Sequence, residues 1–139
     1  MRYSKSTRYA LYAALEMAAA SGPVTVAQVA ALHRLPETAL AKVMQALVRA
    51  GIARGVRGVG GGYVLARSAG EISTLDVIAA FDPPRREGDC LLDDGGGGEC
   101  RGHLDCRLRR LFDEVDEQLR CTFASVSLET LVRGARARQ

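Results

Sequence analysis

The stretch IARGVRGVGGGYVLAR, residues 52–67, consists of two short β-prone runs on either side of a glycine-rich turn. The runs extend from Ile52 to Val56 and from Tyr63 to Ala66, and the turn between them carries Arg57. This pattern predicts a β-hairpin with a flexible basic tip. Because glycine has no Cβ, the backbone of such a tip can approach a phosphate or the floor of a DNA minor groove closely.

Phosphate-binding loops of nucleotide enzymes are also rich in glycine, so a nucleotide site is an alternative interpretation of this turn. Those loops run from a strand into a helix and carry a lysine and a hydroxyl side chain. The turn within residues 52–67 runs from strand to strand. A nucleotide site is therefore disfavoured.

Three helices are predicted ahead of the hairpin. Residues 3–20 place apolar side chains at helical spacing among alanines, and the sequence SGP at 21–23 stops the run. Residues 25–33 open with Thr25 and Gln28 at capping-box spacing, at which each side chain can bond to the backbone N–H of the other residue. These signals define the first two helices.

The third helix is predicted over residues 36–50, because Pro36 suits a first helical position and apolar residues recur at helical spacing. Gly51 is well suited to a left-handed C-cap. Two helices joined by a short turn form a helix-turn-helix, whose second helix can enter a major groove about 12 Å wide; a generic three-helix bundle is the alternative. The exposed positions predicted on this helix are Glu37, Thr38, Ala39, Ala41, Lys42 and Gln45, of which Thr38, Lys42 and Gln45 can bond to bases or phosphates.

Charge is divided unevenly along the chain. Residues 1–67 carry nine lysines and arginines against two glutamates, a net charge of +7. Residues 68–139 carry ten arginines against fourteen acidic residues, a net charge of −4. A basic half joined to an acidic half is typical of a nucleic-acid-binding region attached to a different module, and a merely solvated basic face is the alternative.

The acidic half begins with a short helix predicted between Ile72 and Phe81, which the prolines at 83 and 84 end because they cannot continue the hydrogen-bond ladder. A long helix is predicted from about residue 104, and its narrow apolar stripe needs a partner helix. A twofold dimer formed through two such helices would present two DNA-binding regions to a palindromic operator. Ser127 is predicted to cap a last short helix that Gly134 ends. The stripe consists of Leu104, Leu108, Leu111, Phe112, Val115, Leu119 and Phe123.

Three of the four cysteines lie in the loop after the short helix and at the start of the long helix, with the spacing Cys90-x9-Cys100-x5-Cys106. Structural zinc sites usually pair ligands two to four residues apart, so these wider gaps disfavour zinc. An odd number of cysteines and the reducing interior of a cell disfavour disulfides. Thiolates on a loop can instead hold an iron-sulfur cluster or remain as free or redox-active thiols.

The start MRYSKSTRYAL, the turn VRGVGGGYVL and the three-cysteine segment together resemble the Rrf-type (IscR/NsrR-like) family of winged helix-turn-helix transcriptional regulators. The resemblance covers nearly the whole chain. It implies a cytoplasmic homodimer, a repressor, that binds a palindromic operator in double-stranded DNA. Together with Gln45 from the helix pattern, the DNA-contact residues that it implies are Ser4, Lys5, Thr38, Lys42, Arg57, Gly58, Gly60, Gly61 and Gly62.

The resemblance also implies that operator affinity is controlled by an iron-sulfur cluster, either 2Fe-2S or 4Fe-4S, that senses iron, redox state or nitric oxide. Its implied ligands are Cys90, Cys100 and Cys106. Relatives take the fourth ligand from positions that hold Arg109 and Arg8 here, and arginine cannot ligate. The candidates left for the fourth ligand are His103 and, more weakly, Cys121, which lies off the apolar stripe and is expected to be a small buried residue.

The chain departs from the family pattern at two DNA-binding positions. Arg34 stands where a glycine is common in the helix-turn-helix turn, and Ala41 stands where a relative carries a base-reading glutamate. The operator sequence therefore does not transfer to this chain.

The predicted fold class is mainly α with a small β-hairpin wing, that is, a winged helix-turn-helix with a long C-terminal dimerisation helix. No apolar run approaches the ~18 residues of a membrane-spanning helix, and no membrane partner is expected. A metal-free thiol redox-sensing regulator and, less favoured, a small redox enzyme remain alternatives to the metal-dependent regulator. The predicted segments are a DNA-binding region at 1–67, a connecting helix at 68–82, a cluster-binding loop at 83–103, and the dimerisation and C-terminal helices at 104–139.

Overall fold

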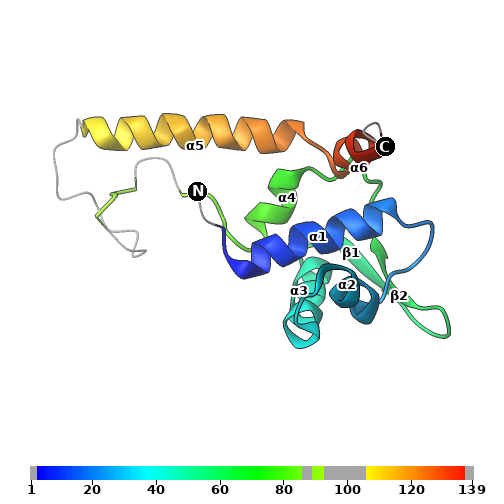
Figure 1. The fold of residues 1–139 in the computed structure, drawn as a ribbon. Helices are drawn as coiled ribbons and strands as arrows, with labels where there is room; N and C mark the ends of the chain where they lie inside the picture. Colours follow the sequence, from blue (N-terminus) through cyan, green and yellow to red (C-terminus); the bar gives the residue numbers. More distant parts are fainter. Residues whose placement is uncertain (1–2, 86–88, 93–105, 137–139) are drawn as a thin grey trace. The chain divides into compact units, whose positions relative to one another are not determined.

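The computed structural model describes residues 3–85, 89–92 and 106–136. The chain divides into two compact units, of which the first combines Met1–Pro83 with Phe123–Gln139 and the second is Pro84–Thr122. The described elements, drawn in Figure 1, are α1 (Lys5–Ala19), α2 (Val26–His33), α3 (Glu37–Arg49), β1 (Ala53–Val56), β2 (Gly62–Leu65), α4 (Thr74–Ala79), α5 (Arg107–Ser125) and α6 (Leu128–Arg136).

The second helix begins with the predicted capping box. The backbone N–H of Gln28 donates to Thr25 Oγ1 at 3.1 Å, and the backbone N–H of Thr25 donates to Gln28 Oε1 at 2.8 Å. The third helix begins one residue later than predicted, because Pro36 is extended and serves as the N-cap. Gly51 adopts a φ of 74° after this helix, and the amide of Ile52 returns to the carbonyl of Leu47, as expected for a left-handed cap.

The turn between α2 and α3 contains Arg34 in the left-handed region, with φ 54° and ψ 46°. Arg34 is the only described residue other than glycine with positive φ. Glycine adopts this conformation without the steric cost that a Cβ imposes, which explains why glycine is common at this position. The helix-turn-helix geometry is therefore kept with arginine, at a conformational cost.

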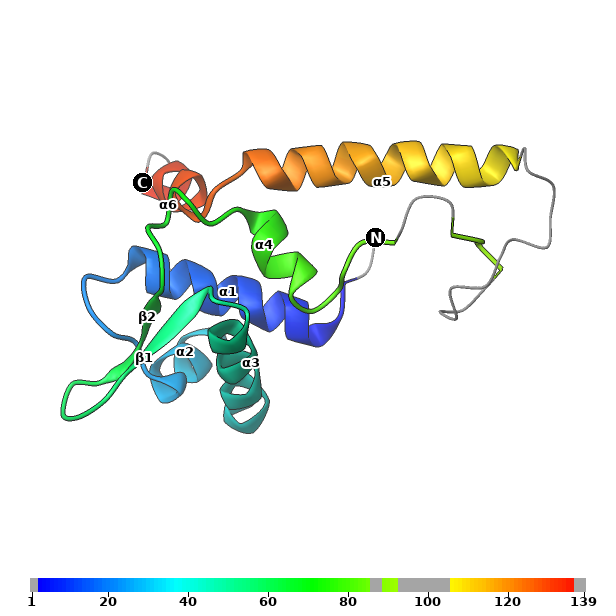
Figure 2. The same cartoon turned by 180° about the vertical axis from the view of Figure 1, so that it is seen from behind.

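The strands β1 and β2 form an antiparallel hairpin in which Gly55 lies opposite Tyr63. A third extended segment joins them, because the amide of Val24 donates to the carbonyl of Tyr63 at 3.0 Å and the amide of Tyr63 donates to the carbonyl of Val24 at 2.8 Å. Figure 2 shows the loop of the hairpin projecting away from α1, α2 and α3. The predicted class, mainly α with a hairpin wing, is confirmed.

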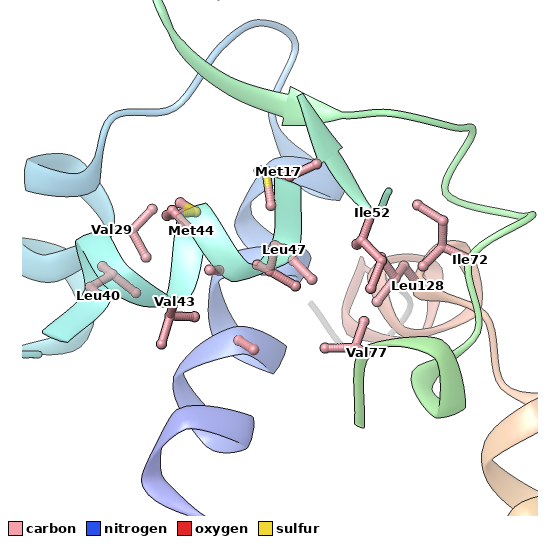
Figure 3. Packing of buried hydrophobic residues seen from close by; sticks show 14 of the residues in the cluster. Met17, Val29, Leu40, Val43, Met44, Leu47, Ile52, Ile72, Val77 and Leu128 are labelled. Atoms are coloured by element: carbon pink, nitrogen blue, oxygen red, sulfur yellow. The ribbon is translucent and has the colours of Figure 1, made fainter. Parts of the chain in front are cut away.

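Helix α3 supplies the centre of the hydrophobic core. Its side chains Leu40, Met44 and Leu47 are fully buried (Figure 3), and they meet small residues of α1, chiefly alanines, that let the two helices pack closely. The helical spacing of these residues leaves the opposite face of α3 to solvent. The core is completed by Ala10, Ala13, Ala14, Met17, Val29, Ala30, Val43, Ile52, Ala53, Ile72, Val77 and Leu128.

The C-terminal helix α6 belongs to the first unit and is hydrogen-bonded to the segment that precedes α4. The amide of Leu128 donates to the carbonyl of Ile72 at 2.9 Å, and the side chain of Leu128 is fully buried. Ser127 caps the helix as predicted, since its Oγ accepts from the amide of Thr130 at 3.1 Å. The predicted end at Gly134 is wrong, because α6 continues to Arg136; an interior glycine weakens a helix by only about 1 kcal/mol.

None of the described residues of helix α5 is buried. Its apolar side chains Leu108, Leu111, Phe112 and Val115 are 61%, 54%, 46% and 41% exposed. None of the helices in the described ranges combines the length and the apolar character that crossing a lipid bilayer requires.

Candidate DNA-binding surface and cysteine segment

The solvent-facing side of α3 carries the predicted major-groove residues. Thr38, Lys42 and Gln45 are all exposed, while Ala39 and Ala41 are half-buried. The three polar side chains therefore lie on the side of the helix opposite the core, as the sequence pattern predicts.

The hairpin loop carries Arg57 as an exposed side chain. Gly58 and Gly60 have φ values of 98° and 75°, and a Cβ added to either would meet no atom within 4 Å. Val59 between them is fully exposed, and its apolar side chain at the tip is a feature that the sequence analysis did not single out. These two glycines are required by the turn, and the space around them is open to a ligand.

Gly61 and Gly62 have a different role. A Cβ on Gly61 would lie 2.4 Å from the carbonyl oxygen of Val56, and a Cβ on Gly62 would lie 2.4 Å from the carbonyl oxygen of Val24. Glycine is therefore required at both positions by contacts within the protein, independently of any contact with DNA.

A hollow of about 360 Å³ is lined by residues of α3 and of the hairpin. At this hollow, Gln45 Nε2 of the helix donates a hydrogen bond to Tyr63 Oη of β2 at 2.8 Å. Two predicted DNA-contact residues from different elements, Gln45 and Arg57, thus border one concave surface. The lining residues are Gln45, Val48, Gly55, Val56, Arg57, Gly62 and Tyr63.

The N-terminus of α1 carries Ser4 as its N-cap and Lys5 as its exposed first residue. Asp82 lies against this helix end, and its Oδ2 accepts from the amide of Ser4 at 2.9 Å and from the hydroxyl of the fully buried Thr7 at 2.7 Å. Hydrogen bonds from Thr7 and Ser4 hold the pKa of the Asp82 carboxyl below its ordinary value. The sequence carries no local sign of this contact, because Asp82 follows Ser4 by 78 residues.

Replacing Asp82 with alanine is expected to lower the free energy of unfolding by about 1–2 kcal/mol at pH 7, because two donors at the end of α1 lose their acceptor. A carboxyl whose pKa is lower in the folded state stabilises the fold above its unfolded-state pKa of about 3.9, and this contribution is lost as the pH falls through the folded-state value. Asp82→Asn keeps an acceptor oxygen but carries no charge. The difference in the free energy of unfolding between this variant and the unmutated protein should therefore shrink below pH 4. Urea unfolding at pH 7 and pH 3 measures both effects, and equal stability of all three proteins at pH 7 would contradict the assignment.

Two of the three predicted thiol ligands lie in the described part of the second unit. Cys90 and Cys106 are free thiols and half-buried. Cys106 directly precedes α5, its Sγ accepts from the amide of Arg109 at 3.5 Å, and its carbonyl accepts from the amide of Arg110 at 3.1 Å. The side chain of Cys106 therefore accepts from the first turn of α5, in the manner of an N-cap.

The other predicted ligands have different outcomes. Cys100 and His103 lie outside the described residues. Within the described ranges, no group of three or more histidine, cysteine, aspartate or glutamate side chains is placed to hold a metal ion. The expectation that Cys121 is buried is wrong: Cys121 is exposed on α5, one helical turn after Glu117.

Arg85 links Asp89, the residue before Cys90, to α5. Its guanidinium donates to the carbonyl of Asp89 at 2.7 Å and to Asp116 Oδ2 at 3.2 Å, and it pairs with Asp113. Partial burial alone would lower the pKa of Arg85, but the two carboxylates outweigh it and raise the pKa. Asp89 is therefore linked through Arg85 to α5, the helix that Cys106 directly precedes.

The sequence profile of the Rrf2 family, described as that of an iron-dependent transcriptional regulator, matches residues 3–134. The chain belongs to the Rrf2 family. It is 33% identical over 135 residues to the HTH-type transcriptional regulator IscR of Xenorhabdus nematophila. This alignment covers 96% of this chain and 80% of the relative. It is 35% identical over 135 residues to the putative HTH-type transcriptional regulator BadM of Rhodopseudomonas palustris, with 96% and 82% covered.

Solved structures have the same fold as this Rrf2-family protein. The global cysteine regulator CymR of B. subtilis superposes with a TM-score of 0.77 at 25% identity, covering 96% of this chain and 97% of that one. IscR of T. potens superposes with a TM-score of 0.78 at 23% identity, covering 100% and 91%. The family resemblance read from the sequence is confirmed. The relatives are transcriptional regulators and not enzymes, which removes the redox-enzyme alternative.

Proposed function

We propose that this Rrf2-family regulator is a cytoplasmic repressor that binds a palindromic operator as a homodimer, and that an iron-sulfur cluster held by Cys90, Cys100 and Cys106 controls its affinity. The observation that carries the DNA-binding part is the surface shared by α3 and the hairpin, on which Gln45 and Arg57 border one hollow. Thr38 and Lys42 extend it along the exposed side of α3.

The chemistry of these side chains indicates which part of the DNA each of them would contact. A helix fits the major groove, where Thr38, Lys42 and Gln45 offer donors and acceptors to base edges and phosphates. An arginine on a glycine-rich turn suits the narrow minor groove, whose negative potential attracts a cation. Ser4 and Lys5 at the start of α1 suit the phosphate backbone.

The apolar stripe of α5 supports the homodimer. Leu108, Leu111, Phe112 and Val115 recur at helical spacing and are between 41% and 61% exposed. A second copy of the same stripe would bury these side chains against their equivalents, as a twofold interface requires. Two DNA-binding regions related by a twofold axis match a palindromic operator.

The cysteine chemistry supports an iron-sulfur cluster. Cys90 and Cys106 are free thiols, and thiolates are the usual ligands of such clusters, so the described donors fit the group. Bound there, the cluster would supply a centre that responds to iron, redox state or nitric oxide. Cys90 and Cys106 lie at the two ends of a segment between α4 and α5, so ligation by both would constrain the connection between the DNA-binding region and the dimer helix.

A metal-free thiol regulator is the second candidate, because the same free thiols, Cys90 and Cys106, could respond to oxidation directly. The structural relative CymR, named as a global cysteine regulator, also has this fold. Iron and sulfide analysis of protein purified without oxygen separates the two candidates. Stoichiometric iron and sulfide support the cluster, and their absence from a protein that still binds DNA supports the thiol regulator.

Replacing Arg57 with alanine is expected to weaken operator binding by about 1–3 kcal/mol and to reduce the dependence of binding on salt, because one contact to a minor groove or phosphate is lost. Fluorescence titration of an operator duplex at several salt concentrations measures both quantities. Arg133→Ala, which removes one exposed, glutamate-paired arginine from α6, is the matched control for charge. An Arg57→Ala protein with unchanged affinity and unchanged salt dependence would remove the hairpin from DNA recognition.

A further inference from the structure

The hydrogen bond between Gln45 and Tyr63 joins the solvent-facing side of α3 to the hairpin. Gln45 is exposed and Tyr63 is half-buried, and the donor Nε2 and the acceptor Oη are 2.8 Å apart. An exposed hydrogen bond between neutral groups adds little to the stability of a fold, since water can replace either partner. The effect of this bond is therefore mainly on where the Gln45 amide lies.

Tyr63 is a rigid partner for this bond. Its backbone exchanges two hydrogen bonds with Val24 and lies opposite Gly55 in the hairpin, so it is held from both sides. Its ring packs against the hydrophobic core. The position of the hydroxyl is therefore set by the sheet and the core, while the Gln45 side chain has three rotatable bonds that the hydroxyl restrains.

The restraint determines what Gln45 can offer to a base. One amide hydrogen is used by Tyr63, which leaves Oε1 as an acceptor and one hydrogen on Nε2 as a donor. In the major groove, adenine offers a donor at N6 and an acceptor at N7, and cytosine offers a donor at N4, whereas guanine offers two acceptors. The remaining groups of Gln45 match a base with an exocyclic amino group, and they match adenine with two bonds.

We propose that Tyr63 is a specificity-determining positioning residue, whose hydroxyl holds the Gln45 amide so that it selects adenine or cytosine at one position of each operator half-site. Tyr63 acts through Gln45 and its own contact with DNA is not required. The inference rests on the proposed DNA binding and adds which residue orients the reading side chain and which class of base it selects.

The test is selection of binding sites from a pool of random-sequence DNA duplexes by four proteins: unmutated, Tyr63→Phe, Gln45→Ala and the double variant. Tyr63→Phe keeps the ring and removes only the hydroxyl. Both single variants are expected to lose the adenine or cytosine preference at the same position and to keep the other positions. Affinity for the site selected by the unmutated protein should fall about 3- to 10-fold in each, and the double variant should fall no further than Gln45→Ala.

Three outcomes separate the inference from the proposed function. If the unmutated protein selects no sequence, the proposed DNA-binding function fails. If the unmutated protein selects a site and Tyr63→Phe selects the same site with full preference at every position, the positioning role is overturned. It is also overturned if Tyr63→Phe weakens all positions equally together with a lower thermal midpoint, because that pattern indicates a structural role. Tyr12→Phe, which removes an exposed tyrosine hydroxyl from α1, serves as the control.

Discussion

Replacing Cys90, Cys100 or Cys106 singly with alanine is expected to remove essentially all bound iron, because each thiolate is a proposed ligand and an iron with a missing ligand would be open to solvent and oxygen. Anaerobic reconstitution with iron and sulfide, followed by visible spectra and metal analysis, measures the loss. The helical content should stay close to that of the unmutated protein, since Cys90 and Cys106 contribute nothing to the hydrophobic core. Operator affinity should change, because the proposed ligation would constrain the connection between α4 and α5.

Two further variants make this experiment discriminating. Cys121→Ala removes an exposed thiol from α5 and is expected to leave iron binding unchanged. His103→Ala tests the fourth ligand, and a cluster that forms but becomes labile to oxygen or changes its spectrum would support that role. If the three alanine variants at positions 90, 100 and 106 bind as much iron as the unmutated protein, the ligands lie elsewhere and the cluster site proposed here is wrong.

Replacing Gly62 with alanine is expected to lower the free energy of unfolding by roughly 2–3 kcal/mol and to weaken operator binding. The φ of 150° is a conformation that residues with a Cβ rarely adopt, and the new Cβ would lie 2.4 Å from the carbonyl oxygen of Val24. Relief of this overlap requires the segment at Val24 to separate from β2, which would release the backbone of Tyr63. Urea unfolding measures the stability, and titration of an operator duplex measures the binding.

Gly55→Ala is the matched control for this prediction. Gly55 lies in the same hairpin, opposite Tyr63, and a Cβ added to it meets no atom within 4 Å. Its replacement should therefore change stability by no more than about 0.5 kcal/mol. If Gly62→Ala unfolds at the same urea concentration as Gly55→Ala, the backbone contact with Val24 does not constrain the hairpin.

Local signals predicted most of the helix-turn-helix and the hairpin correctly. The capping box of Thr25 and Gln28 and the left-handed Gly51 depend on residues within a few positions of each other, so their geometry follows from neighbouring side chains. The fold class could also be inferred from the order of these elements and from the spacing of the apolar residues in α3. The predicted end of α6 at Gly134 is wrong, because a single glycine inside a helix costs only about 1 kcal/mol and does not by itself end the helix.

For the cysteine segment, the sequence predicts which thiols are present but not what they bind. The spacing of Cys90, Cys100 and Cys106 identifies a set of thiols, but spacing alone does not choose between a cluster and free thiols. Cys121 was expected to be a small buried residue because it lies off the apolar stripe of α5, but it is exposed, as are its described neighbours on that side of the helix. Burial depends on what surrounds a helix, and helical periodicity does not report it.

The sequence by itself determined the family, the helix-turn-helix, the basic hairpin and the set of candidate DNA-contact and thiol residues, because these depend on residue type and short-range spacing. Only the tertiary structure decided that Asp82 binds the N-terminal end of α1, that Tyr63 holds Gln45, that Arg85 pairs with carboxylates of α5, and that Gly62 is required by Val24. Each of these contacts joins side chains or backbone atoms many residues apart. No local pattern in the sequence predicts them, because each depends on how the folded chain places distant segments next to one another.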